Sequence, residues 1–112
     1  MTVRKLAKAA WQAYFDRMSK AIEGKRAEIE VASLALGDQV EAEWIPIFGI
    51  VYDSKSDIVE IASEELDHII HKPREIAVED GPDGLESIEV IDDEGTVQMV
   101  KLRDPIMLPP PA

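Results

Sequence analysis

Two histidines, the only ones in the chain, stand three residues apart beside a group of acidic side chains. The candidate ligands in this stretch are His68, His71, Glu64, Glu65 and Asp67. Two imidazoles and a carboxylate suit zinc or iron, provided that both rings lie on one face. A spacing of three gives that arrangement on a helix but sends the rings to opposite faces of a strand. Because Ile69-Ile70 and Pro73 favour a strand, the sequence predicts that the rings diverge and that no metal is bound.

His68 borders the acidic stretch, where an imidazole could serve as a general base or contact a ligand. A small-ligand-binding protein or an enzyme that uses His68 with its neighbouring carboxylates is therefore the alternative interpretation. Other catalytic signatures are missing from the sequence. The chain has no Cys, no serine in a Gly-x-Ser-x-Gly setting and no glycine-rich phosphate loop. We therefore expect no catalytic residue and no cofactor.

Three further acidic groups lie in segments that read as turns. They are Asp53 with Asp57, Asp80 with Asp83, and Asp92, Asp93 and Glu94. Carboxylates in loops can bind calcium, but none of these groups has the spacing of the twelve-residue calcium loop. Asp and Gly are common in turns for backbone reasons, so these groups are interpreted as solvated turns.

The net charge of −11 is unevenly distributed along the 112 residues. Residues 1–26 contain seven basic and two acidic residues, whereas residues 27–112 contain five basic and 21 acidic residues. The acidic body argues against a nucleic-acid-binding protein, which attracts phosphate with Lys and Arg, and against binding to an anionic membrane. The sequence contains neither a signal-peptide pattern nor an apolar run long enough to span a bilayer, so we expect a cytoplasmic protein.

These candidate residues must be positioned by one helix and a small sheet. Apolar residues recur at helical spacing over residues 3–22, with Thr2 as the predicted N-cap and Gly24 in the position of a left-handed C-terminal residue. We expect this amphipathic helix to pack on its own acidic sheet through Trp11, Tyr14 and Met18. A partner groove or a second copy is the alternative.

After Gly24 the apolar period changes to two, as in half-buried strands. We predict about six short strands. The segments that read as strand or strand-like are residues 27–31, 40–44, 47–52, 58–62, 68–71, 75–79, 87–91 and 96–102. Residues 47–52 are apolar on both faces, which predicts a central strand in the core. Short turns join the segments, so the sheet should be antiparallel. The fold class is therefore α+β, with an N-terminal helix followed by a small curled sheet or open barrel.

Three segments carry a family resemblance. They are Trp11-Gln12-Ala13-Tyr14-Phe15-Asp16, the run from Trp44 to Asp53, and His68-Ile69-Ile70 with Pro73. The chain resembles a family of small bacterial proteins known only as a domain of unknown function. The resemblance implies a bacterial source, a free-standing small domain and a cytoplasmic location. It brings no catalytic or binding residue with it.

Taken together, the sequence predicts a single domain over residues 1–104, followed by a proline-rich extended tail over residues 105–112. The expected function is that of a non-enzymatic binding or interaction module. Its partner is an unidentified protein or a second copy, reached through the helix or through a sheet edge. A barrel that binds RNA in the Sm-like manner is a third hypothesis, which rests on fold analogy and is disfavoured by the acidic body.

Overall fold

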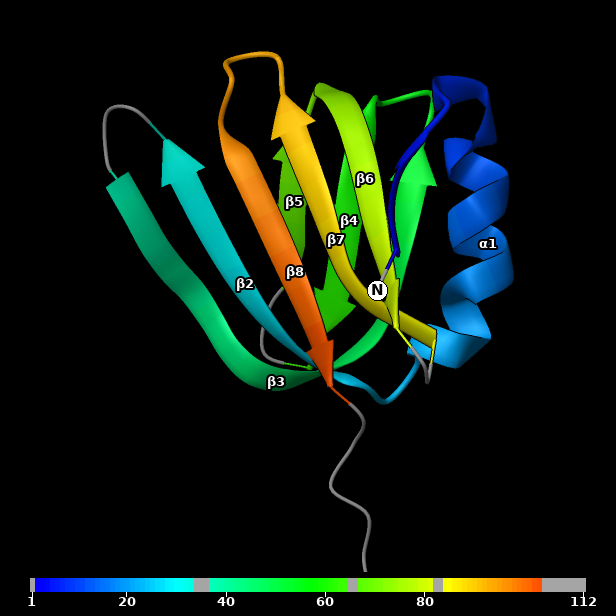
Figure 1. The fold of residues 1–112 in the computed structure, drawn as a ribbon, viewed down its shortest axis with the longest axis vertical. Coiled ribbons are helices and arrows are strands. Elements are labelled where there is room, and N and C mark those ends of the chain that lie inside the picture. The colour runs from blue at the N-terminus through cyan, green and yellow to red at the C-terminus, as the bar shows by residue number, and fades with distance from the viewer. Residues whose placement is uncertain (1, 34–36, 65–66, 82–83, 104–112) are drawn as a thin grey trace, which may run out of the picture.

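The computed structural model describes residues 2–33, 37–64, 67–81 and 84–103 (Figure 1). In chain order the elements are β1 (Thr2–Leu6), the 3-10 helix η1 (Lys8–Ala10), α1 (Trp11–Ile22), β2 (Arg26–Ser33), β3 (Gly37–Asp53), β4 (Ile58–Ser63), β5 (His68–His71), β6 (Pro73–Gly81), β7 (Gly84–Asp92) and β8 (Val97–Arg103). The predicted α+β class and the antiparallel strand pairing are confirmed. The tail from residue 105 onward lies outside the described residues.

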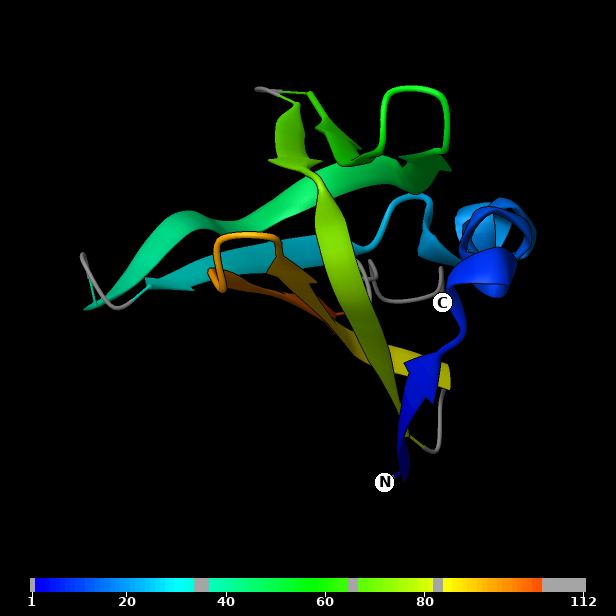
Figure 2. The same ribbon diagram turned by 90° about the horizontal axis from the view of Figure 1, so that it is seen from above.

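All the described strands form one unclosed sheet in the order β1-β6-β7-β8-β2-β3-β4-β5. The sheet curls until β3, β4 and β5 lie over β2, β8 and β7 as two layers (Figure 2). Alternate residues of both layers point inward and form the core, as expected for strands with one buried face. The inward set includes Ile29, Ile50, Ile61, Ile70, Ile76, Ile88, Val90 and Val100.

Strand β3 belongs to both layers because it changes partner at Pro46. Its first half pairs with β2 as far as Pro46, and from Ile47 onward it pairs with β4. Proline has no N–H to donate to a ladder, which suits the point where one partner ends and the next begins. Trp44, just before this point, has a left-handed φ of 51°. The junction of the two layers therefore lies at Pro46.

The N-terminal prediction was wrong for residues 3–10. These residues form β1 and η1, and the α-helix begins only at Trp11, so Thr2 starts a strand and caps no helix. Val3 and Leu6 are three residues apart, which suits one face of a helix but opposite faces of a strand. Pairing with β6 selects the strand, in which Val3 is exposed and Leu6 packs against the core. Arg4 bonds Asp80 at 3.1 Å, and the Lys5 ammonium bonds Glu75 at 2.8 Å. The basic N-terminal segment therefore joins the acidic sheet as strand β1, paired with β6.

The remaining helix, α1, packs on its own sheet as expected. Trp11, Tyr14, Phe15 and Ile22 are buried, and Met18 lies against the same core. The helix covers the side of the curled sheet next to β1 and β3 (Figures 1 and 2). Trp11 meets the ring of Tyr52 edge-on with centroids 5.2 Å apart. The helix ends where predicted, because Gly24 adopts a φ of 84°.

Candidate functional site

The structure confirms that His68 and His71 diverge. Both lie on β5, where residues alternate between the inner and outer faces. The His68 ring points inward and its Nε2 contacts the side-chain Oε1 of Gln98 on β8, across the two layers. His71 is exposed on the other face. The rings therefore cannot hold one metal ion together.

The carboxylates around the histidines are solvent-exposed. Glu64 follows β4 and Asp67 precedes β5, and both side chains are exposed, whereas Glu65 lies outside the described residues. Within the described ranges, no group of three or more His, Cys, Asp or Glu side chains could hold a metal ion. His68 contacts a buried amide, while Asp67 and Glu64 face solvent, so these candidates form no common site among the described residues.

A different feature stands out on the outer face of β3, β4 and β5. The residues 47–52 were predicted to be buried on both faces, but only one face is. Ile47, Ile50 and Tyr52 are buried, whereas Phe48 and Val51 are 56% and 46% exposed. The prediction failed because the two layers cover each strand from one side only, and no described element covers the outer side.

Strand pairing gathers the exposed apolar residues into one surface. Val51 pairs with Glu60, and Glu60 pairs with Ile69, so these three form one row across β3, β4 and β5. Ile69 is 41% exposed. A bulge sets Phe48 and Gly49 together opposite Ala62, which turns Phe48 outward while Ile47 and Ile50 point inward. We call Phe48, Val51 and Ile69, with half-buried Ile58 and Ala62, the apolar outer face.

A hollow of about 440 Å³ adjoins the apolar outer face at the β3–β4 hairpin. Its lining combines outer-face residues with the hairpin and one residue of α1. The lining residues are Gln12, Val51, Tyr52, Asp53, Ser54, Lys55, Ile58 and Glu60. The hairpin is well fixed, because the Tyr52 hydroxyl donates to Asp57 Oδ1 at 2.8 Å. The apolar outer face is therefore bordered by a concave surface.

The surroundings of the apolar outer face are acidic. Glu60 stands in its central row, and the exposed carboxylates of Asp53, Glu64 and Asp67 surround it. Hydrogen bonds from the backbone N–H groups, first of Lys55 and then of Ser56, lower the pKa of Asp53 below its ordinary value. Asp53 therefore stays ionised at neutral pH, and the surface combines apolar area with negative charge.

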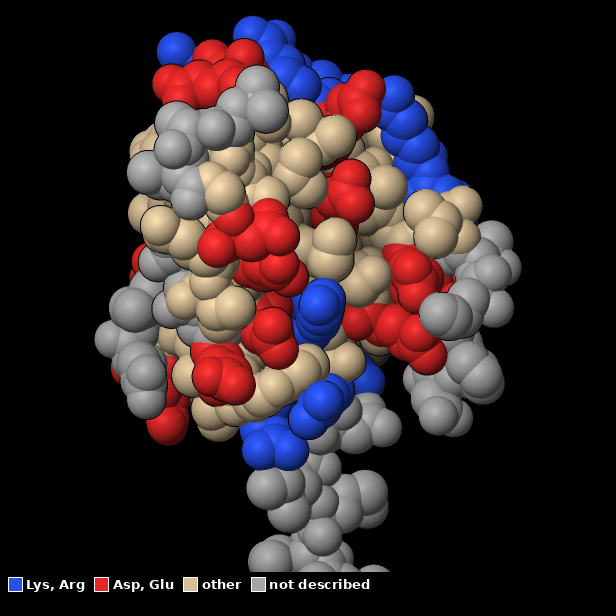
Figure 3. Space-filling model, turned by 60° about the vertical axis from the view of Figure 1, so that its left-hand side comes forward, with Lys and Arg blue, Asp and Glu red and all other residues tan. Residues whose placement is uncertain are grey.

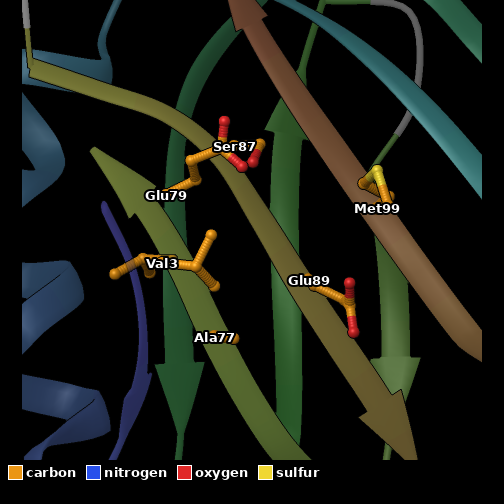
Figure 4. A pocket seen from close by; sticks show the side chains of 7 residues that line it. Val3, Ala77, Glu79, Ser87, Glu89 and Met99 are labelled. Atoms are coloured by element: carbon orange, nitrogen blue, oxygen red, sulfur yellow. The ribbon is translucent and has the colours of Figure 1, made fainter. Parts of the chain in front are cut away.

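The outer face of the other layer is more polar. A shallow hollow of about 110 Å³ lies on β1, β6, β7 and β8, with the carboxylates of Glu79 and Glu89 beside Val3, Ala77 and Met99 (Figure 4). Lys101 pairs with Glu30 at 3.5 Å on the same face. Viewed from the side of β2 and β3, acidic side chains are spread over the surface, and basic ones lie mostly at its upper and lower ends (Figure 3). The exposed large apolar residues of this face, Val3 and Val40, lie on β1 and β3, which four strands separate, so among the described residues they form no common group.

Sequence reasoning missed the apolar outer face as a candidate site, although its signal was visible. A run that is apolar on both faces was interpreted as a central strand, because that is its commoner cause. The same pattern arises when one face is buried in the core and the other serves a partner. Only the layer arrangement separates the two cases.

Comparisons with known proteins identify the family of this chain, but neither the family nor the relative has a described activity. The model of a family of unknown function, DUF5335, matches residues 2–111. An uncharacterized protein of Aquifex aeolicus (strain VF5) is 39% identical over 110 residues, which cover 97% of this chain and 99% of that protein. No solved structure matches the chain. Among the described helices, none has the length and apolar character needed to cross a membrane.

Proposed function

We propose that this chain, which belongs to the DUF5335 family of unknown function, is a protein-interaction module. Its docking surface is the apolar outer face of β3, β4 and β5. Its partner is a protein segment that presents apolar side chains flanked by Lys or Arg. The apolar side chains contact the outer face, and the basic groups meet the surrounding carboxylates.

The observation that carries this proposal is the grouping of Phe48, Val51 and Ile69. Single exposed apolar residues are ordinary on protein surfaces, but a contiguous group bordered by polar residues marks a binding surface. Three large apolar side chains, each more than 40% exposed, lie here on β3 and β5, on either side of β4 and beside a hollow. Covering them removes apolar area from water, which is the main driving force of association.

The acidic surroundings define the chemistry of the partner. Asp53, Glu60, Glu64 and Asp67 lie around or within the apolar outer face. The nearby cations include Lys55 on the hairpin and Lys72 at the end of β5. Complementary charge steers association and rejects wrong partners, while apolar contact supplies most of the affinity. An acidic partner would be repelled, whereas Lys or Arg at the margins of an apolar stripe would be attracted.

The test uses a defined probe, a synthetic amphipathic peptide with Leu at helical spacing and Lys at the other positions. We expect it to bind the wild-type protein in a calorimetric titration. Val51→Ser should weaken binding about tenfold, which corresponds to loss of one apolar contact worth about 1.4 kcal/mol. Val40→Ser is the matched control, because Val40 is 55% exposed on the same strand but outside the apolar outer face.

A second peptide with Glu in place of Lys separates charge from apolar contact. We expect this peptide to bind at least tenfold more weakly than the Lys peptide at low salt. The proposal is wrong if Val51→Ser and Val40→Ser weaken binding equally, or if the two peptides bind alike. The stability of each variant is measured by urea unfolding, so that a loss of binding is not confused with a loss of fold.

A further inference from the structure

Strand β5 is one of the two ends of the sheet. It pairs with β4 on one side, and no described strand pairs with its other side. An unpaired strand edge presents N–H and C=O groups that another strand can complete. Natural edges are often protected by Lys or Pro within the strand, but β5 reads His-Ile-Ile-His and has neither. Its edge is therefore open to pairing.

The hydrogen bonds of the sheet show which residues of β5 offer these groups. The Lys72 N–H donates to the Asp57 carbonyl at 2.9 Å, one step beyond the pair formed by Ile58 and His71. Bonded and non-bonded pairs alternate along an antiparallel ladder. The backbone of Ile70 therefore bonds to β4, whereas the N–H and C=O groups of Ile69 and His71 point to the open edge.

These groups are self-complementary. If a second β5 lies antiparallel across a two-fold axis at Ile70, Ile69 of each copy faces His71 of the other. Both residues have their N–H and C=O groups on the open edge, so the two pairs can each exchange two backbone hydrogen bonds. A symmetric interface needs one patch that complements itself, and this edge meets that requirement.

The charges along the edge are also self-complementary. The exposed carboxylate of Asp67 precedes β5, and the exposed side chains of Lys72 and Arg74 follow it. In the same two-fold arrangement His68 lies opposite Lys72 of the second copy. Asp67 of each copy is therefore brought to the end of the other β5, where the basic residues Lys72 and Arg74 follow. Because each chain carries a net charge of −11, which repels a second copy, these local attractions are what favour this register.

We infer that two copies of this chain pair through β5 and form a symmetric dimer. The two three-stranded layers then become one continuous antiparallel layer. Side chains of directly opposed residues point to the same face, so Ile69 of both copies lies on the outer side. The two apolar outer faces join into one surface twice as large. The pairing stands on the β5 edge and does not depend on a partner binding that surface.

Cross-linking tests the register directly, because the natural chain has no cysteine. We make Ile69→Cys and His71→Cys as separate proteins, both at exposed positions. Opposed residues of a bonded pair have Cα atoms about 5.5 Å apart, within the range of a disulfide. We expect mixed, oxidised samples of the two variants to form a covalent heterodimer. Each variant alone should give little dimer, since its cysteines are offset by two residues.

Val40→Cys, mixed with either variant, is the control for random collision. A heterodimer yield no higher than that control would overturn the inference. So would a mass of 12.5 kDa for the wild-type protein by light scattering at every concentration tested.

Charge reversal gives a second, non-covalent test. Asp67→Arg and Arg74→Glu should each raise the dimer dissociation constant at least fivefold. A chain that carries both substitutions should have a dissociation constant close to that of the wild-type protein. Failure of the combined variant to recover dimerisation would contradict the proposed register. Peptide binding to Val51 is measured on the same proteins, so the docking surface and the dimer are tested apart.

Discussion

The guanidinium of Arg103 lies 3.7 Å from the centre of the Trp44 ring. Arg103 ends β8, and Trp44 lies on β3 just before that strand leaves β2 for β4. The stack therefore ties β8 to β3 across β2, at the point where the sheet passes from one layer to the other. Trp44 also has a left-handed backbone conformation, which costs a non-glycine residue about 1–2 kcal/mol.

We predict that Arg103→Ala lowers the free energy of unfolding by about 1 kcal/mol, the usual size of a partly exposed cation–π contact. The Trp44 fluorescence should change in the same variant, since its ring loses a stacked charge. Urea unfolding and emission spectra measure the two effects. Lys101→Ala, on the same strand, is the control, because its ion pair with Glu30 is partly exposed and contributes less. Equal effects of both substitutions would contradict a special role for the stack.

Helix α1 should be an integral part of the core. Phe15 is fully buried, so Phe15→Ala removes a large apolar side chain and leaves a cavity. Such changes cost about 3–5 kcal/mol, a large part of the stability of a small domain. Asp16→Ala, at the next and exposed position, should change stability little. Thermal and urea unfolding compare the two variants, and a Phe15→Ala protein as stable as the control would mean that the helix is dispensable.

Gly24 and Gly49 should respond in opposite ways to the same substitution. Gly24 ends α1 with a φ of 84°, so Gly24→Ala forces a Cβ into a strained backbone and should destabilise the protein by about 1–2 kcal/mol. Gly49 has no positive φ, and an added Cβ would meet no atom within 4 Å. Gly49→Ala should therefore be neutral or stabilise by up to about 1 kcal/mol. Similar losses in both variants would contradict this assignment.

Stability should fall at alkaline pH. Burial, and then the nearby Asp80 carboxylate, raises the pKa of Tyr14. Burial, and then the hydrogen bond to Asp57, raises the pKa of Tyr52. The folded state therefore holds these protons at a pH where the unfolded chain has lost them, so stability declines as the pH rises above about 10. Urea midpoints across this range should fall less steeply in Tyr14→Phe, and an unchanged decline would exclude Tyr14 as a contributor.

Much of the fold follows from local patterns. The period-two runs, the polar turn at Asp53 and the glycine at the end of α1 all have short-range physical causes, and each is found in the structure. The divergence of His68 and His71 also follows from the strand pattern alone. Residues 3–10 could not be assigned in this way. The spacing of Val3 and Leu6 suits a helix, and only the distant pairing with β6 selects the strand.

The candidate site depends on long-range structure in the same way. Phe48 and Val51 read as core residues, because the sequence does not show which face a neighbouring layer covers. Ile69 joins them through two strand pairings, Val51 with Glu60 and Glu60 with Ile69. The open edge of β5 could not be read from its four residues either, since it follows from the order of all the strands.

The central claim, that the apolar outer face is the docking surface, is tested most directly by NMR mapping. Amide shifts of the isotope-labelled protein are followed while the unlabelled Leu/Lys peptide is added. We predict that the largest saturable shifts fall on Phe48, Val51, Glu60 and Ile69, and that residues around Glu79, Glu89 and Met99 shift little. Shifts centred on Glu79, Glu89 and Met99, or spread evenly over all the acidic residues, would contradict the claim.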